Sequence, residues 1–152
     1  MPARPRVTVA AVIERAGQFL LVEEEDGGRI VFNQPAGHLE LDESLVDACA
    51  REVLEESAWH FRPRELVGIY RWSRPRLRAK AAVTYVRFAF CGELGEHEAG
   101  RRLDTGIVRA VWLHPEEIRA SRERHRSPLV LRCVEDYLAG SRFPLDAVID
   151  YA

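Results

Sequence analysis

Three glutamates, Glu52, Glu55 and Glu56, lie close together in the run ESLVDACAREVLEES, which is rich in good helix formers and free of Gly and Pro. At about 100° per residue, a helix would place their carboxylates within about 100° of arc on one side. Like charges at such spacings cost a helix about 0.2–0.5 kcal/mol per pair. A hard divalent ion such as Mg²⁺ or Mn²⁺ would remove that repulsion, because it prefers oxygen ligands. The pattern indicates a metal site or, as the plainer alternative, a solvated acidic face.

The residues around this helix add a longer pattern. Gly37, Glu43 and the run REVLEESAW over residues 51–59 resemble the Nudix box of the Nudix hydrolase family, G-x5-E-x7-R-E-U-x-E-E-x-G-U. Every charged position of the box is present at the family spacing. The end of the box departs from the pattern, because Ala58 replaces the last glycine and Trp59 replaces a bulky aliphatic residue. A glycine there would serve a left-handed helix terminus, which Ala58 would occupy at a cost of about 1 kcal/mol.

The resemblance extends over most of the chain. The segments NQPAGHLELDESL (33–45), RSPLV (126–130) and GSRFPLD (140–146) are similar to the phosphatase NudJ subgroup of Nudix hydrolases. The resemblance implies that the metal ligands are Glu52, Glu55, Glu56 and the carbonyl of Gly37. A carboxylate beside the attacking water would act as the general base, and we expect this to be Glu52, although family members differ in which glutamate serves. Arg51 and Glu43 would pair and orient Glu52, and a merely structural ion pair fits their spacing equally well.

Other polar and aromatic residues are candidates for contact with substrate. Arg87 lies in an apolar strand and must be paired, either with a structural carboxylate or with a substrate phosphate. Tyr85 would share its face, and Trp72 could stack on a base or simply pack. His38, beside Gly37, could touch phosphate or water, or hydrogen-bond within its loop.

Two further groups of charged residues have a binding role or a plain surface role as alternatives. A further metal ligand could come from a distal loop, where the acids are Glu96, Glu98 and Asp104. The basic loop SRPRLRAK could steer a polyphosphate towards the site. Solvent exposure without function is the other interpretation of both groups.

Composition limits the remaining function classes. The 152 residues fit one domain spanning 1–152, with 47% hydrophobic and 30% charged residues and a formal charge of −2, which argues against a general nucleic-acid binder. The cysteines, Cys49, Cys91 and Cys133, form no CxxC pair and suggest a reducing, cytoplasmic location without a disulfide framework or a structural zinc site. No apolar run approaches the roughly 18 residues of a membrane span.

Hydrophobic patterning predicts strands interleaved with helices. We expect strands at 7–13, 19–25, 30–32, 65–72, 82–92 and 110–113, and a loop over 93–105. Helices are expected from the N-cap Asp42 to Ser57, from Pro115, and from Ser127-Pro128 to Gly140. This order predicts the α/β (α+β) class, with a mixed β-sheet sandwiched between α-helices, as in the Nudix fold, and a ligand crevice between them.

The family resemblance implies a Mg²⁺-dependent (or Mn²⁺-dependent) hydrolase that cleaves phosphoanhydride bonds. The expected substrates are nucleoside tri- and diphosphates and also thiamine-type pyrimidine pyrophosphates. One alternative is a pyrophosphatase for ADP-ribose, dinucleotides or oxidised nucleotides, and another class of alternative is a nucleotide-sensing binding module. We expect a small phosphorylated molecule as the only partner, with no nucleic acid and no membrane, and a monomer or homodimer.

Overall fold

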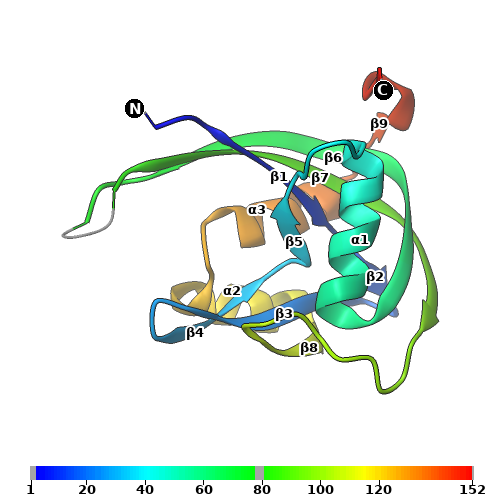
Figure 1. Cartoon of the computed structure of the whole chain (residues 1–152). Helices are drawn as coiled ribbons and strands as arrows, with labels where there is room; N and C mark the ends of the chain where they lie inside the picture. Colours follow the sequence, from blue (N-terminus) through cyan, green and yellow to red (C-terminus); the bar gives the residue numbers. More distant parts are fainter. Residues whose placement is uncertain (1–2, 78–80, 152) are drawn as a thin grey trace.

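The chain forms two β-sheets and three α-helices (Figure 1), described over residues 3–77 and 81–151 by a computed structural model. The five-stranded sheet has the order β5-β1-β7-β6-β9, in which β1 and β7 run parallel and the other pairs are antiparallel. Its strands are β1 (Arg6–Ala11), β5 (Ala36–His38), β6 (Trp59–Arg74), β7 (Val83–His97) and β9 (Phe143–Pro144). The expected mixed sheet is therefore present.

A second, antiparallel sheet lies beside the first. It contains β2 (Glu14–Arg15), β3 (Gln18–Asp26) and β4 (Arg29–Asn33), and β8 (Ile107–Leu113) pairs with the other side of β3. The helices are α1 (Leu45–Ser57), α2 (Pro115–Ala120) and α3 (Leu129–Leu138), with short 3-10 turns η1 (Arg122–Arg124) and η2 (Leu145–Ala147). None of the helices in the described part of the chain has the length and apolar character needed to cross a membrane.

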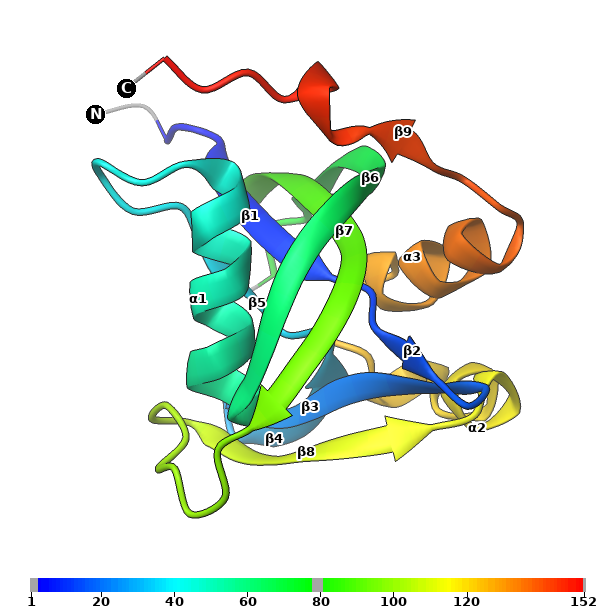
Figure 2. The same cartoon turned by 90° about the vertical axis from the view of Figure 1, so that its right-hand side faces the viewer.

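Helices α1 and α3 cover opposite faces of the five-stranded sheet (Figure 2). The alternation along β1 shows why, because Val9 and Ala11 pack in one buried cluster with α1, whereas Ala10 and Val12 pack in another with α3 and β3. Both clusters contain fully buried aliphatic side chains from both sheets. The two apolar faces of the sheet thus place α1 on one side and α3 on the other, and the second sheet contributes to both clusters.

Several element boundaries differ from those expected from the sequence. Helix α1 is capped by Ser44, whose hydroxyl accepts from the amide of Asp47 at 3.0 Å, and not by Asp42, which has a positive φ of 62°. Residues 93–97 extend β7 instead of opening the expected loop, because long pairing with β6 continues to the contact between Trp59 and His97. Cross-strand pairing overrode the local polar composition there.

Ala58 ends α1 in the left-handed conformation that the missing glycine had suggested. Its φ is 64° and its ψ is 11°, and its amide donates to the carbonyl of Leu54 at 3.0 Å. Strand β6 begins at the next residue, Trp59. The tight exit is therefore preserved without glycine, and it fixes the end of the helix that carries the three glutamates.

Candidate active site

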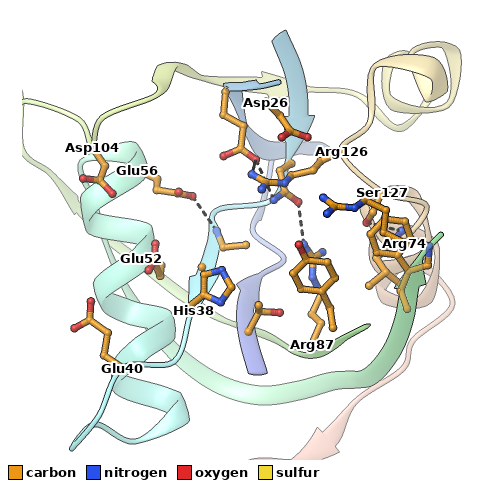
Figure 3. A pocket seen from close by; sticks show the side chains of 18 residues that line it. Asp26, His38, Glu40, Glu52, Glu56, Arg74, Arg87, Asp104, Arg126 and Ser127 are labelled. Atoms are coloured by element: carbon orange, nitrogen blue, oxygen red, sulfur yellow. Dashed lines mark hydrogen bonds and ion pairs between the residues drawn. The ribbon is translucent and has the colours of Figure 1, made fainter. Parts of the chain in front are cut away.

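A cavity of about 380 Å³ opens over the five-stranded sheet, between α1 and the segment before α3 (Figure 3). Its floor follows from strand register, because His38, Thr8 and Arg87 are paired across β5, β1 and β7. Tyr85 lies two residues before Arg87 in β7, so it points to the same face, and it pairs with Trp72 of β6. The walls come from α1, β3, β4 and the segment before α3. Among the described residues, those lining it are Thr8, Glu24, Asp26, Asn33, Ala36, Gly37, His38, Glu40, Glu52, Glu56, Trp72, Arg74, Tyr85, Arg87, Asp104, Arg126, Ser127 and Leu129.

Helix α1 contributes two buried carboxylates, Glu52 and Glu56, which are 8% and 7% exposed. The carboxylate of Glu52 lies where a side chain at position 37 would be, so that a Cβ on Gly37 would collide with it. Glu56 accepts a hydrogen bond from the backbone amide of Ala36 at 2.9 Å. The lack of a side chain at Gly37 in the edge strand β5 therefore lets α1 extend its acids into the cavity.

Burial makes both acids unusually reluctant to ionise. It raises the pKa of Glu56 to about 9, and the charges of Glu24, Glu52 and Asp104 add to the effect against one backbone hydrogen bond. Burial also raises the pKa of Glu52 to about 7, although the Arg51 guanidinium opposes this. Within the described residues, the partner that holds Glu56 is an amide and not a cation. In this corner of the cavity, Arg51 therefore compensates only Glu52, and burial keeps Glu56 protonated at neutral pH.

Arg51 of α1 forms hydrogen bonds with three carboxylates at once, those of Glu43, Glu52 and Glu55. Its guanidinium makes two hydrogen bonds to the carboxylate of Glu43, at 2.7 and 3.0 Å. It also donates to Glu52 at 2.8 Å and to Glu55 at 2.9 Å. A further bond, at 3.1 Å, goes to the backbone carbonyl of His38. Arg51 therefore ties the loop, β5 and the helix together and fixes one oxygen of Glu52.

The three glutamates of the helix do not occupy equivalent positions. Glu55 is outside the set that lines the cavity and is engaged by Arg51. Among the distal acids, Asp104 lines the cavity, and its amide donates to the carbonyl of Glu55 at 2.9 Å. Glu98 instead pairs with His60 and Arg101, and Glu96 does not reach the cavity.

A divalent ion fits the chemistry of this acidic corner. The available donors, the carboxylates of Glu52, Glu56 and Asp104, are hard oxygens. A bound cation would favour the ionised forms of Glu52 and Glu56, which burial disfavours. No three acidic, His or Cys side chains of residues 3–77 and 81–151 converge into a ready-made cage. That arrangement suits Mg²⁺, which usually takes one or two carboxylates and completes its coordination with waters and substrate phosphates.

The other side of the cavity is basic (Figure 3). Arg87 is only 6% exposed and donates to the amide oxygens of Asn33 and Gln34, at 2.9 and 2.8 Å. Arg126 pairs with Glu24 at 2.8 Å. Of the two alternatives foreseen for Arg87, the structural carboxylate is not found among the described residues, because its protein partners are neutral amides.

An aromatic pair forms the rim beside these arginines. The rings of Trp72 and Tyr85 are stacked, with centroids 5.9 Å apart and an angle of 15° between their planes. Arg74, two residues after Trp72 at the end of β6, also lines the cavity. Arg76 of the same loop is exposed and is not among the residues that line the cavity, and Arg78 and Lys80 lie outside the described residues.

Sequence reasoning placed Gly37, His38, Glu52, Glu56, Trp72, Tyr85 and Arg87 among candidate site residues, and the fold brings all seven to one cavity. It missed the residues that hold Arg87 and the carboxylates on β3. Asn33 and Gln34 had a weak signal, since two consecutive amides lie at the end of β4, shortly before Gly37. Glu24 and Arg126 had none, because they are 102 residues apart in the chain and meet only through the fold.

Comparison with known proteins agrees with this geometry. Residues 3–133 match the family model described as NUDIX domain. Phosphatase NudJ of Escherichia coli K12 is 38% identical over 148 residues, which cover 97% of this chain and 93% of that protein. A solved NUDIX hydrolase from Nitrosomonas europaea is 52% identical, with a TM-score of 0.90 over 97% of this chain and 98% of the other. A MutT protein from Methanosarcina mazei Go1, 22% identical with a TM-score of 0.69 over 91% and 97% of the two chains, shares the fold.

The chain therefore belongs to the Nudix family and is an enzyme of the Nudix hydrolase type. Within the family, it is similar to the phosphatase NudJ proteins along nearly its whole length.

Proposed function

We propose that this enzyme hydrolyses phosphoanhydride bonds of small phosphorylated molecules with the help of Mg²⁺ or Mn²⁺, as a NudJ-like phosphatase. Nucleoside tri- and diphosphates are the first candidate substrates, and thiamine-type pyrimidine pyrophosphates are the next. The observation that carries the proposal is the cavity with buried acids on one side and arginines on the other. Such a charge distribution fits an anionic chain of phosphates bound together with a cation.

Four groups would hold the ion in this proposal: the carboxylates of Glu52, Glu55 and Glu56 and the carbonyl of Gly37. Glu52 and Glu56 already face the cavity, whereas Glu55 would have to release Arg51 to join them. Asp104 is a further candidate from the distal loop. When bound, a divalent ion supplies neutralisation of phosphate oxygens and lowers the pKa of a water that attacks phosphorus.

The protein's own groups would position the substrate and move the proton. We assign the general base to Glu52, because its carboxylate is buried at the cavity beside the proposed metal site, where it can take a proton from the attacking water. Arg51 would act through Glu52, by holding one of its oxygens at 2.8 Å and leaving the other for the cavity. Glu43 would hold Arg51 in turn.

On the basic side of the cavity, Arg87 would bind a phosphate of the substrate. His38, which is paired with Thr8 and through it aligned with Arg87 in the sheet, would lie near that phosphate. The stacked pair of Trp72 and Tyr85 would support an aromatic base at the rim. Burial together with Arg6 and Arg126 lowers the pKa of His38, so that a neutral imidazole is expected there at pH 7.

Glu52→Gln and Glu56→Gln test the proposal. Each should lower kcat by orders of magnitude in an assay of phosphate release with Mg²⁺, because each replaces an anionic oxygen with an amide while keeping its volume. Glu116→Gln, on the exposed side of α2, is the matched control and should keep full activity. Wild-type turnover in either cavity variant would place the chemistry elsewhere.

The alternative substrates differ in their products. A pyrophosphatase for ADP-ribose, dinucleotides or oxidised nucleotides would release a nucleoside monophosphate, whereas the proposed phosphatase would release inorganic phosphate from nucleotides. A screen of nucleotides and phosphorylated cofactors, with products identified by mass, separates them. A nucleotide-sensing module would bind without forming any product, but such a sensor has no need for costly buried acids.

A cytoplasmic location belongs to the same proposal, because all three cysteines, Cys49, Cys91 and Cys133, are free and buried. We propose no nucleic-acid or membrane partner, and either a monomer or a homodimer.

A further inference from the structure

Arg87 carries a buried charge that its protein partners do not neutralise. The side chain is among the least exposed charged groups of the chain, at 6%. In the described residues its hydrogen bonds go to the amide oxygens of Asn33 and Gln34, with a weaker contact to the sulfur of Cys133 at 3.9 Å. Burying a guanidinium without an anion is costly, and buried charges are normally paired.

The two amides hold the guanidinium in place without cancelling its charge. Gln34 is itself fixed, because its amide nitrogen donates to the carbonyl of Val130 at 2.7 Å. Asn33 is fixed by donating to Glu24 at 3.3 Å. These additional hydrogen bonds orient both amide oxygens towards Arg87. They thereby fix the position of its guanidinium at the cavity wall.

The nearest carboxylate in this network is already used. The same oxygen of Glu24 that accepts from Asn33 also accepts from Arg126 at 2.8 Å. Arg126 therefore compensates Glu24, and no carboxylate of the described residues completes an ion pair with Arg87. The network ends in a net positive charge at the cavity wall.

We propose that Arg87, held by Asn33 and Gln34, forms a phosphate subsite that works without the metal and holds a phosphate other than the one at Glu52 and Glu56. This inference rests on the proposed function, and it narrows the substrate to molecules with phosphates at both ends of the cavity. The guanidinium fork matches two phosphate oxygens, and its low exposure excludes competing water. Figure 3 shows Arg87 across the cavity from the carboxylates of α1.

Pyrophosphate titration of the metal-free protein in EDTA tests the subsite, by calorimetry or by ³¹P NMR. Wild-type protein should bind, and Arg87→Gln should bind about 10- to 100-fold more weakly, as expected for lost charge-assisted hydrogen bonds. Arg119→Gln is the matched control, because it removes an exposed arginine that pairs with Glu135 away from the cavity. Equal binding by wild type and Arg87→Gln, or no binding by wild type, would overturn the proposal.

Asn33→Asp tests the role of the uncompensated charge while keeping Arg87. The new carboxylate would lie at the 2.9 Å position of the present amide oxygen and pair with the guanidinium. Pyrophosphate binding should again weaken about 10-fold or more. Unchanged affinity in this variant would show that the free charge does not carry binding.

Turnover with Mg²⁺ separates this inference from the proposed function. Arg87→Gln should raise KM more than it lowers kcat, because the subsite binds substrate and transition state alike. Absence of wild-type turnover would contradict the proposed function and leave the binding result in EDTA intact. If the wild-type protein failed to bind pyrophosphate in EDTA but turned over substrate fully with Mg²⁺, only the subsite would be contradicted.

Discussion

Metal binding should release protons, because the two buried acids of the site are partly protonated without it. At pH 7, a pKa of about 9 leaves Glu56 almost fully protonated, and a pKa of about 7 leaves Glu52 about half protonated. Binding of an ion to both carboxylates therefore releases about one proton from the first and about half a proton from the second. At pH 9 the same reasoning gives about half a proton in total, almost all from Glu56.

Calorimetric titration of the metal-free protein with Mn²⁺, in two buffers of different ionisation enthalpy, measures this number. The apparent affinity should rise about 30-fold between pH 6.5 and 7.5, as release of about 1.5 protons requires. Glu56→Gln should remove about one proton from the release at pH 7, whereas Glu116→Gln should not change it. Release near zero in the wild type, or release unaffected by Glu56→Gln, would refute the assignment of these acids as ligands.

The raised pKa of Glu56 also sets the sign of stability against pH. The folded value of about 9 lies above the ordinary 4.5, so the contribution is fully present below pH 4.5 and is lost as the pH rises through 9. The metal-free protein should therefore unfold at lower urea concentration at pH 9 than at pH 6, and Mn²⁺ should reduce this difference. Urea unfolding at the two pH values thus tests the same raised pKa of Glu56 as the proton release on Mn²⁺ binding.

The remaining predictions concern the residues that place Glu52. Gly37→Ala should lower kcat by about 100-fold, because the new Cβ displaces the carboxylate of Glu52. Tm should change little, because the backbone at Gly37 has no positive φ and accepts alanine. Kinetics and a thermal melt together check this, and unchanged kcat would contradict the packing argument. Arg51→Gln should lower the free energy of unfolding by about 1–3 kcal/mol, because the bonds to Glu43, Glu52 and Glu55 are lost. Urea unfolding measures this, and Arg51→Lys should recover only part of the loss, since lysine cannot bond Glu43 in the two-pronged way; full recovery would mean that charge alone matters.

The acidic helix could be predicted from the sequence because it depends only on residues within a few positions of one another. Charged positions three and four residues apart must share a helix side, and good helix formers without Gly or Pro fix the helix itself. Ala58 is a similar case, since the box position demanded a left-handed residue and the structure has φ 64° there. What the spacing could not show is that Glu55 turns to Arg51 whereas Glu52 and Glu56 enter the cavity.

The basic half of the site depended on the fold. The sequence showed that Arg87 needs a partner, but its amide partners come from the end of β4, 53 and 54 residues earlier. The start of α1 was also mispredicted, because both Asp42 and Ser44 are good N-cap residues and only tertiary placement chooses between them. Long pairing of β6 with β7 likewise overrides the polar composition after residue 92.

The most direct measurement is the position of Mn²⁺ in crystals of this protein, located by its anomalous scattering. The ion should lie in the cavity between the carboxylates of Glu52 and Glu56, with Glu55 or Asp104 as further ligands. A peak away from α1, or those side chains pointing into bulk solvent beside a fully active enzyme, would contradict the central claim that this helix binds the ion that hydrolysis requires.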